Sequence, residues 1–156
     1  MCTSTMNRKH LLLCATFAFC IASLGIPIST AQTVTWEQIK KQSDVQGGLI
    51  VHLGCGDGDL TATLGAGDAY IVQGLDTDAE KISAARARIK SEGRYGNVSA
   101  DVFDGKNLPY IDNLVNLLVS EKLGDVPMSE VMRVLAPGGV AGIKRDGKWN
   151  MHVKPW

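Results

Sequence analysis

Three glycines stand directly after a short apolar run, and this junction constrains the fold more than any other part of the chain. Residues 49–53 read Leu-Ile-Val-His-Leu, and glycine then occupies positions 54, 56 and 58. A continuous apolar run of this length predicts a strand buried on both faces, which is typical of parallel sheets. Glycines after such a strand allow a tight turn and let a ligand approach the backbone where no Cβ stands. We therefore expect a ligand site at the end of this strand.

Short apolar runs and amphipathic stretches alternate along the rest of the chain. Thr77, with Glu80 three residues on, is expected to open a helix as a capping box, and Gly93 to stop it. The expected strands are residues 49–53, 70–75, 98–101, 114–119 and 140–144, and the expected helices lie at 35–43, 77–92 and 128–136. Strands that alternate with helices indicate right-handed βαβ units, so the sequence predicts an α/β fold with a parallel sheet.

The helix expected from residue 128 has one apolar stripe. Met128, Val131, Met132 and Leu135 recur at helical spacing, and the Pro-Gly-Gly sequence at 137–139 is expected to end the helix. Methionines at such spacing are typical of a core rather than of a cofactor site.

The first 31 residues differ from the rest and are excluded from the expected fold. Basic residues at 8 and 9 precede an apolar run from Leu11 to Leu24, and residues 29–31 read Ser-Thr-Ala. These are the parts of a secretory signal peptide with cleavage after Ala31. An uncleaved membrane anchor is the alternative, but it needs about 20 apolar residues, and Pro27 closes this run early. The sequence thus predicts an exported protein, periplasmic or extracellular, without a stable membrane anchor.

The composition of the remaining 125 residues narrows the classes of partner. They carry 14 basic and 16 acidic side chains and no basic run, so no nucleic-acid surface is expected. Three of the four cysteines belong to residues 1–31, and Cys55 alone cannot form an intrachain disulfide. No second Cys or His stands at ligand spacing from it, so we propose no metal site.

An acidic residue after the second expected strand strengthens the prediction of a ligand site. Asp76 follows Gly58 by 18 residues, and in such folds an acidic residue at this place binds the two hydroxyls of a ribose. Asp76 could instead serve only as a carboxylate at a helix N-terminus, and the two roles are compatible. We therefore expect a nucleoside at the glycine loop.

The spacing of the glycines bears on which nucleoside binds. The dinucleotide fingerprint is G-x-G-x-x-G, whereas the third glycine here comes one residue early. Asp57 and Asp59 flank it, and two carboxylates would repel a pyrophosphate. A cationic ligand without phosphate, such as S-adenosylmethionine, is favoured over NAD.

Four sequence motifs follow one another along the chain: LGCGDG at 53–58, GLDTD at 74–78, DGKNLPY at 104–110 and RVLAPGG at 133–139. Together they resemble the motifs of the class I (Rossmann-like) S-adenosylmethionine-dependent methyltransferases of the small-molecule type. The resemblance spans about residues 49–144 and implies a Rossmann-like sheet flanked by helices, with S-adenosylmethionine as cofactor. It also implies that Asp76 holds the ribose and that Asp104 meets the adenine amino group. The cofactor contacts that it implies are Gly54, Cys55, Gly56, Gly58, Asp76, Thr77, Asp104 and Gly105.

The chain departs from the family's pattern at three places. His52 stands where the family has an acidic residue that contacts the methionine amine; it either contacts the ligand or is a satisfied histidine at a strand end. Asn116 replaces the usual Asp of the fourth strand. Glu121 and Lys122 stand where many amine methyltransferases have a Pro-Pro-Tyr sequence, which disfavours that subclass. We nominate no catalytic residue.

The end of the chain departs further. The family adds two more strands after the fifth, whereas only a weak β segment at 149–153 follows here. We expect a sheet incomplete at its C-terminal end, lacking strands 6 and 7, whose open edge pairs with a homodimer partner or a missing C-terminal domain. The expected organisation is a signal peptide at 1–31, a helix and linker at 32–48, the cofactor-binding domain at 49–144 and a truncated tail at 145–156. The chain is most similar to the methyltransferase-like module of exported bacterial proteins that carry a PQQ-like β-propeller.

Three functions remain open from the sequence. The first is an S-adenosylmethionine-dependent methyltransferase that acts on an unidentified small molecule. The alternative is a non-catalytic module, either scaffold or nucleoside-binding, of a larger exported protein. An NAD-type domain is the third and is disfavoured by the early third glycine and the acidic loop.

Overall fold

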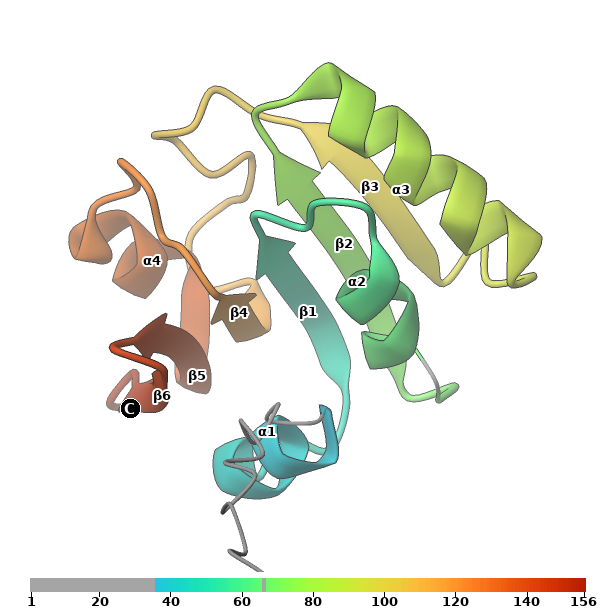
Figure 1. Cartoon of the computed structure of the whole chain (residues 1–156). Coiled ribbons are helices and arrows are strands. Elements are labelled where there is room, and N and C mark those ends of the chain that lie inside the picture. Colours follow the sequence, from blue (N-terminus) through green and yellow to red (C-terminus); the bar gives the residue numbers. More distant parts are fainter. Residues whose placement is uncertain (1–35, 66) are drawn as a thin grey trace, which may run out of the picture. The chain divides into compact units, whose positions relative to one another are not determined.

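One six-stranded sheet organises the part of the chain that the structure describes, residues 36–65 and 67–156 (Figure 1). The structure is a computed structural model. The predicted signal peptide lies outside the described residues. In chain order the elements are α1 (Trp36–Ser43), β1 (Gly48–Leu53), α2 (Asp59–Leu64), β2 (Tyr70–Asp76), α3 (Ala79–Ser91), β3 (Val98–Val102), β4 (Val115–Ser120), α4 (Met128–Val134), β5 (Leu135–Arg145) and β6 (Lys148–Val153).

The strand order is β3-β2-β1-β4-β5-β6, and the first five strands are parallel. The chain runs outward from β1 to β3 on one side and then returns to place β4 on the other side of β1. His52 of β1 accordingly lies opposite Gly74 of β2 and Val119 of β4. Ligands of open parallel sheets bind at the carboxyl ends of the strands where the order reverses, which here is between β1 and β4. The α/β prediction is confirmed.

Helices cover both faces of the sheet (Figure 1). Ile39 of α1, Ala62 of α2 and Ile82 of α3 belong to one buried apolar cluster. Val131 and Val134 of α4 belong to a second cluster on the other face. The apolar strands are buried between the two, because successive side chains of a strand point to opposite faces. No helix within the described ranges is long and apolar enough to cross a membrane.

The start of α3 differs from the prediction. The capping residue is Asp78, whose carboxylate accepts hydrogen bonds from the N–H groups of Glu80 and Lys81, and Thr77 does not cap the helix. The reason lies at Asp76, the last residue of β2. The Asp78 N–H donates to the Asp76 carboxylate, so the chain stays extended for one more residue before the helix begins. The predicted apolar face of α3 and its end before Gly93 are confirmed.

The junction of α4 and β5 also differs. The Pro-Gly-Gly sequence was expected to end the helix, but α4 already ends at Val134 and Leu135 begins β5. Residues 136–139 form an irregularity within the strand, since Leu135 pairs with Val115 and the register resumes with Val140 opposite Leu117. The Gly138 N–H donates to the Lys154 carbonyl beyond β6. The contact with a later segment therefore overrides the local stop signal.

The last described strand lies at an edge of the sheet. β6 pairs antiparallel with β5, which confirms the single strand expected at 149–153. The six-residue helix α2 is not among the elements predicted from the sequence. The partner expected at the open edge stays a prediction.

Replacing Gly58 by Ala should cost about 2–4 kcal/mol of unfolding free energy. Gly58 has a φ of +82°, and an added Cβ would lie 2.8 Å from both Cα and Cβ of Ala85 in α3. The matched control is Gly93→Ala, where φ is +67° but nothing lies within 4 Å of the added Cβ. That variant should lose only about 1 kcal/mol. Urea unfolding of the two variants measures the difference, and equal losses would refute the close α2–α3 approach.

Candidate functional site

Two adjoining cavities lie at the carboxyl ends of the parallel strands. The first, of about 310 Å³, is bordered by the ends of β1 and β2 and by the segments that follow β3 and β4. The second, of about 520 Å³, is bordered by the glycine loop, the end of β4 and the turn between β5 and β6. Gly54, Asp76 and Lys122 line both cavities, which we therefore treat as one groove. The groove lies at the switch point of the strand order, as the topology requires.

The glycine loop turns sharply because its first two N–H groups are bound by the neighbouring strand. The N–H groups of Gly54 and Cys55 donate to the Leu75 carbonyl at 2.7 and 3.2 Å. Gly54, Gly56 and Gly58 all have positive φ, a conformation that favours glycine. Nothing lies within 4 Å of a Cβ added to Gly56, so the backbone there is open to a ligand.

Asp76 joins the glycine loop to the start of α3. Its side chain is buried, and one carboxylate oxygen accepts the Gly56 N–H at 3.1 Å while the other accepts the Asp78 N–H at 3.1 Å. Each carboxylate oxygen has two lone pairs, so one acceptor position on each remains for a ligand. Asp76 therefore shapes the loop and also lines the groove.

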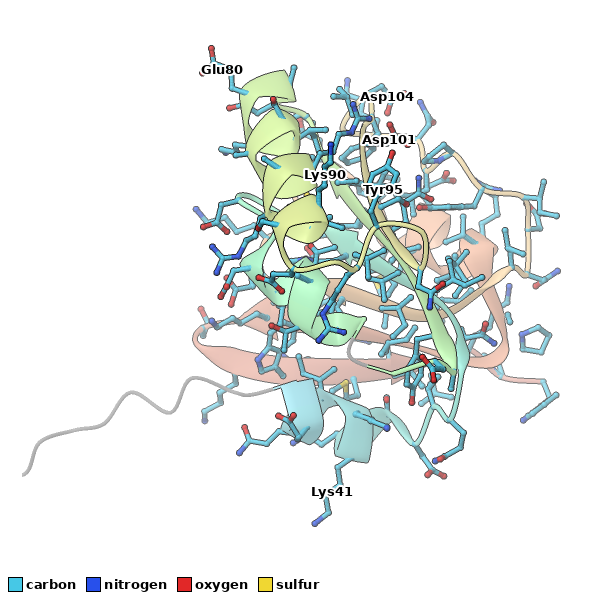
Figure 2. The ribbon with its side chains drawn as sticks, turned by 90° about the vertical axis from the view of Figure 1, so that its right-hand side faces the viewer. Lys41, Glu80, Lys90, Tyr95, Asp101 and Asp104 are labelled. Atoms are coloured by element: carbon cyan, nitrogen blue, oxygen red, sulfur yellow. The ribbon has the colours of Figure 1, made fainter. Side chains whose placement is uncertain are left out.

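Asp104 stands at the wall of the first cavity, at the end of the molecule where α3 begins. Figure 2 shows it at the same end of the molecule as Glu80 and at the opposite end from Lys41. Its carboxylate accepts hydrogen bonds from the N–H groups of Lys106 and Asn107 and from the Asn107 side chain. These hydrogen bonds, first that of the Asn107 side chain, lower the pKa of Asp104 below its ordinary value.

The structure brings six of the eight predicted contact residues to the groove: Gly54, Gly56, Asp76, Thr77, Asp104 and Gly105. Gly58 instead packs against α3, and Cys55 lies beneath the loop. Burial, and next the charge of Asp76, raises the pKa of the Cys55 thiol to about 11, so it stays protonated. A Cβ on Gly74 would lie 3.0 Å from the Cys55 sulfur, which shows how closely this thiol is packed.

His52 is buried under the site. Its Nδ1 lies 2.8 Å from the hydroxyl oxygen of Thr61, whereas its Nε2 is buried without a partner. Burial lowers the pKa of His52 to about 4, although the charges of Glu121 and Asp76 oppose this shift. The ring is therefore neutral at pH 7 and has one unused hydrogen-bonding atom. The sequence left two roles open for His52, ligand contact or a fully hydrogen-bonded histidine. In the structure only one of its two ring nitrogens has a hydrogen-bond partner.

The charges of the groove differ from those inferred from the sequence. Asp57 and Asp59 do not line either cavity, and Asp59 forms an ion pair with Arg88 of α3. Neither carboxylate therefore borders the groove, although the charge of Asp57 still acts on Cys55 in the glycine loop. The second cavity is instead lined by Lys81 of α3, by Glu121 and Lys122 after β4, by Lys144 near the end of β5 and by Asp146 after it. Sequence reasoning noted Glu121 and Lys122 only as departures from the family's pattern and missed the other three. Among them, the Lys144 ammonium lies 2.7 Å from a Glu121 carboxylate oxygen.

The Asn116 departure has a structural explanation. The Asn116 side-chain oxygen accepts the N–H of Leu49 at 3.0 Å, where β1 begins beside β4. A Cβ on Gly48 would lie 2.1 Å from that oxygen, so glycine leaves room for it. An amide oxygen accepts this hydrogen bond as a carboxylate oxygen would, so the substitution does not alter the groove.

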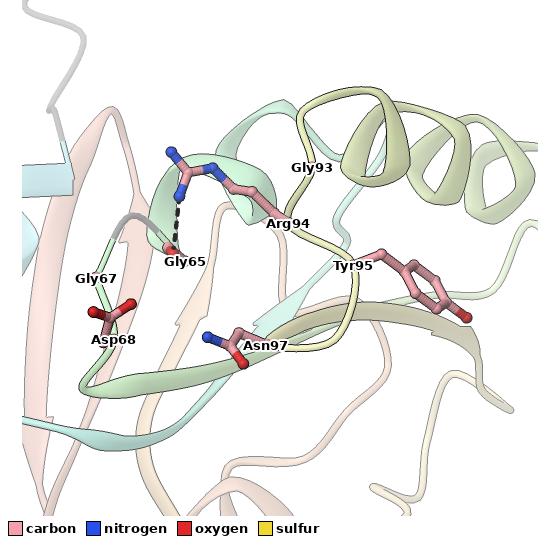
Figure 3. A pocket seen from close by; sticks show the side chains of 7 residues that line it. All are labelled: Gly65, Gly67, Asp68, Gly93, Arg94, Tyr95 and Asn97. Carbon is pink, nitrogen blue, oxygen red and sulfur yellow. Dashed lines mark hydrogen bonds between the residues drawn. The ribbon is translucent and has the colours of Figure 1, made fainter.

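A further cavity of about 440 Å³ lies at the amino ends of β2 and β3, on the opposite edge of the sheet (Figure 3). Arg94 donates to the Gly65 carbonyl there, while the Tyr95 ring points away from Asp68. This cavity is remote from the glycine loop. Among the described residues, no group of three or more His, Cys, Asp or Glu side chains could hold a metal ion.

The sequence model of the methyltransferase domain family matches residues 50–139, a segment that runs from β1 into β5 and holds the glycine loop, Asp76 and Asp104. The chain belongs to this methyltransferase family. S-adenosylmethionine is the cofactor of the family and of this chain.

Individual relatives support the assignment. Methyltransferase GfsG of Streptomyces halstedii is 32% identical over 120 residues, which are 72% of this chain and 43% of that protein. The structure of the [4+2]-cyclase SpnF matches with a TM-score of 0.63 at 23% identity, over 69% of this chain and 42% of that one. Geranyl diphosphate methyltransferase, solved with S-adenosylmethionine, matches with a TM-score of 0.59 at 19% identity, over 69% and 48%. The two structures share the fold. This chain spans less than half the length of each of the three relatives.

The groove fits the methyltransferase cofactor. Gly56 leaves open space at the loop, and Asp76 has free acceptor positions for hydroxyl groups. The cavity volumes lie in the range of about 300–1,000 Å³ typical of small-molecule sites.

Acid should destabilise the protein through His52. The pKa of His52 is about 4 in the fold and 6.5 when unfolded, so its contribution to stability is complete above pH 6.5. As pH falls from 6.5 to 4, the unfolded chain takes up a proton that the folded chain does not. By pH 4.5 this costs about 2–3 kcal/mol. Urea unfolding of His52→Gln should lack this loss, and His152→Gln should keep it. An identical pH profile for wild type and His52→Gln would contradict the neutral buried ring.

Proposed function

We propose that this chain is an S-adenosylmethionine-dependent methyltransferase that acts on a small molecule. The observation that carries the proposal is the position of Asp76. A buried carboxylate at the end of β2, beside the switch point of a parallel sheet, binds the glycine loop and has acceptor positions left over. This is the arrangement that holds a ribose beside a backbone turn.

Each part of the groove has a role in the proposal. Asp76 would accept hydrogen bonds from the ribose hydroxyls, Asp104 from the adenine amino group, and the backbone of Gly54 and Gly56 would border the methionine part. When bound, the cofactor supplies an electrophilic methyl group on its sulfonium. The residues of the chain bind and orient, and such orientation accounts for much of the rate of a direct displacement.

The second cavity is the proposed entrance of the methyl acceptor. It is lined by three lysines and three carboxylates, so its charge is balanced and favours neither an anionic nor a cationic acceptor. Glu121 is engaged by Lys144 and is therefore no free general base. The acceptor accordingly should bring a nucleophile that is already reactive at neutral pH.

The first test is a titration of the full chain with S-adenosylmethionine, S-adenosylhomocysteine and NAD by calorimetry. The first two ligands should bind and NAD should not. If none binds at millimolar concentration, the proposal is wrong. Release of S-adenosylhomocysteine in the presence of a pool of small-molecule acceptors then tests catalysis. Binding without any such release would favour the non-catalytic module.

Asp76→Ala should weaken binding of S-adenosylmethionine about 10- to 100-fold, because hydrogen bonds to a charged group contribute about 1.5–3 kcal/mol. The matched control is Asp68→Ala, which removes an equal charge at the opposite edge of the sheet (Figure 3). Its dissociation constant should equal that of wild type. Equal losses in both variants would mean that Asp76 acts only through net charge.

We also propose that residues 1–31 direct export of the protein. The support is the order of a basic start, an apolar run and small residues before Gln32. The protein recovered from a secreting bacterial host should begin at Gln32 by N-terminal sequencing. Recovery of the uncleaved chain from the cytoplasm would contradict this.

A further inference from the structure

The segment between β3 and β4 carries one wall of the groove but has no regular structure of its own. Residues 103–114 form neither helix nor strand, and Phe103, Asp104 and Gly105 line the first cavity. We call residues 103–114 the base loop. Irregular segments move more than the elements that they connect unless side chains hold them. The position of Asp104 therefore depends on what holds this loop.

Arg133 of α4 holds the loop at three places. Its guanidinium donates to the carbonyl oxygens of Leu108 and Tyr110 at 3.3 and 2.9 Å. It also pairs with the Asp112 carboxylate at 2.6 Å. Two further hydrogen bonds, at 2.8 and 2.6 Å, join the guanidinium to both carboxylate oxygens of Glu130. Such fork-shaped pairs fix the orientation of an arginine, so its remaining N–H groups point in set directions.

Glu130 completes the attachment. One of its carboxylate oxygens accepts the Leu108 N–H at 2.9 Å, so both backbone polar groups of Leu108 are bound to the pair. We call Arg133, Glu130 and Asp112 the clasp. Within the described part of the chain, the side-chain hydrogen bonds that Arg133 makes outside α4 all go to the base loop. Its carbonyl oxygen accepts the Asn113 N–H and a hydrogen bond from the Lys154 ammonium.

The clasp continues directly to Asp104. Asn107 precedes Leu108, and both its backbone N–H and its side-chain amide donate to the Asp104 carboxylate at 2.7 Å. Arg133 is therefore connected to the wall of the first cavity by its hydrogen bond to Leu108, by the peptide bond between Asn107 and Leu108, and by the hydrogen bonds of Asn107 to Asp104. Packing of α4 itself does not need this connection, because Val131 and Val134 already bury its apolar side.

We propose that Arg133 is a positioning residue for recognition of the adenine amino group, and that it acts by fixing the base loop so that Asp104 stays at the cavity wall. The inference rests on the proposed function and deepens it for the same groove. Arg133 itself does not line either cavity. Loss of the clasp should therefore weaken recognition of the base without removing any group that faces the ligand.

The test compares two ligands that differ only at the base: S-adenosylhomocysteine and its deaminated form, S-inosylhomocysteine, which lacks the amino group. Wild type should bind the adenosyl ligand at least tenfold more tightly. In Arg133→Gln this ratio should fall toward one, because the adenosyl ligand loses about tenfold and the inosyl ligand changes less than twofold. Asp112→Asn, which removes one ion pair of the clasp, should lower the ratio two- to threefold.

The control variant is Arg94→Gln, which also removes an ion pair and a hydrogen bond to a carbonyl, but at the opposite edge of the sheet. It should keep the wild-type ratio. Equal weakening of both ligands in the clasp variants would show a general loss of structure and overturn the inference, as would an unchanged ratio. If Arg133→Gln does not fold, Asp112→Asn decides by the same ratio. Wild type that binds neither ligand would instead refute the proposed function, and the inference with it.

Discussion

The buried carboxylate of Asp76 holds the site together. It accepts one N–H from the glycine loop and one from the residue that caps α3, so two turns from separate βα units are fixed to the same side chain. A buried charge is tolerated only when it is hydrogen-bonded, and the two N–H groups meet that need. The same bonds leave the remaining lone pairs in the groove. Folding and ligand binding at this edge of the sheet therefore depend on one residue.

The strands and the main site residues could be predicted because their signals are local. Apolar runs located β1, β2 and β4, and the spacing of Asp76 from the glycines indicated the residue that lines the groove after β2. The cap of α3 could not be predicted as reliably, because Thr77 and Asp78 are both good caps and the Asp76–Asp78 hydrogen bond decides between them. The prediction that the Pro-Gly-Gly sequence ends α4 was wrong for a similar reason. The Gly138 N–H donates to the carbonyl of Lys154, a residue distant in sequence, and the Pro-Gly-Gly segment is part of β5.

The charged lining of the second cavity and the clasp could not be predicted from the sequence, because both depend on which loops meet in the fold. Asp57 and Asp59 are neighbours of the glycines in sequence but do not line the groove. Apart from Asp76, the charged residues of the second cavity come from α3 and from the ends of β4 and β5, and no spacing rule connects them. The sequence showed Arg133 only as the first residue of the RVLAPGG motif and indicated no contact for its side chain. Its contacts with Leu108 and Tyr110 span more than 20 residues, so only the folded chain shows what it holds.

The two halves of the groove differ in how firmly the sheet builds them. The cofactor half is bordered by β1 and β2, which have neighbours on both sides. The other half is bordered by Asp146 and Gly147, in the hairpin that leads to the edge strand β6. Any strand that pairs with β6 would therefore lie next to the hairpin that walls the acceptor half. Under the proposed function, association at this edge would act on the acceptor side of the groove through this hairpin, whereas β4 and β5 separate β1 and β2 from the edge.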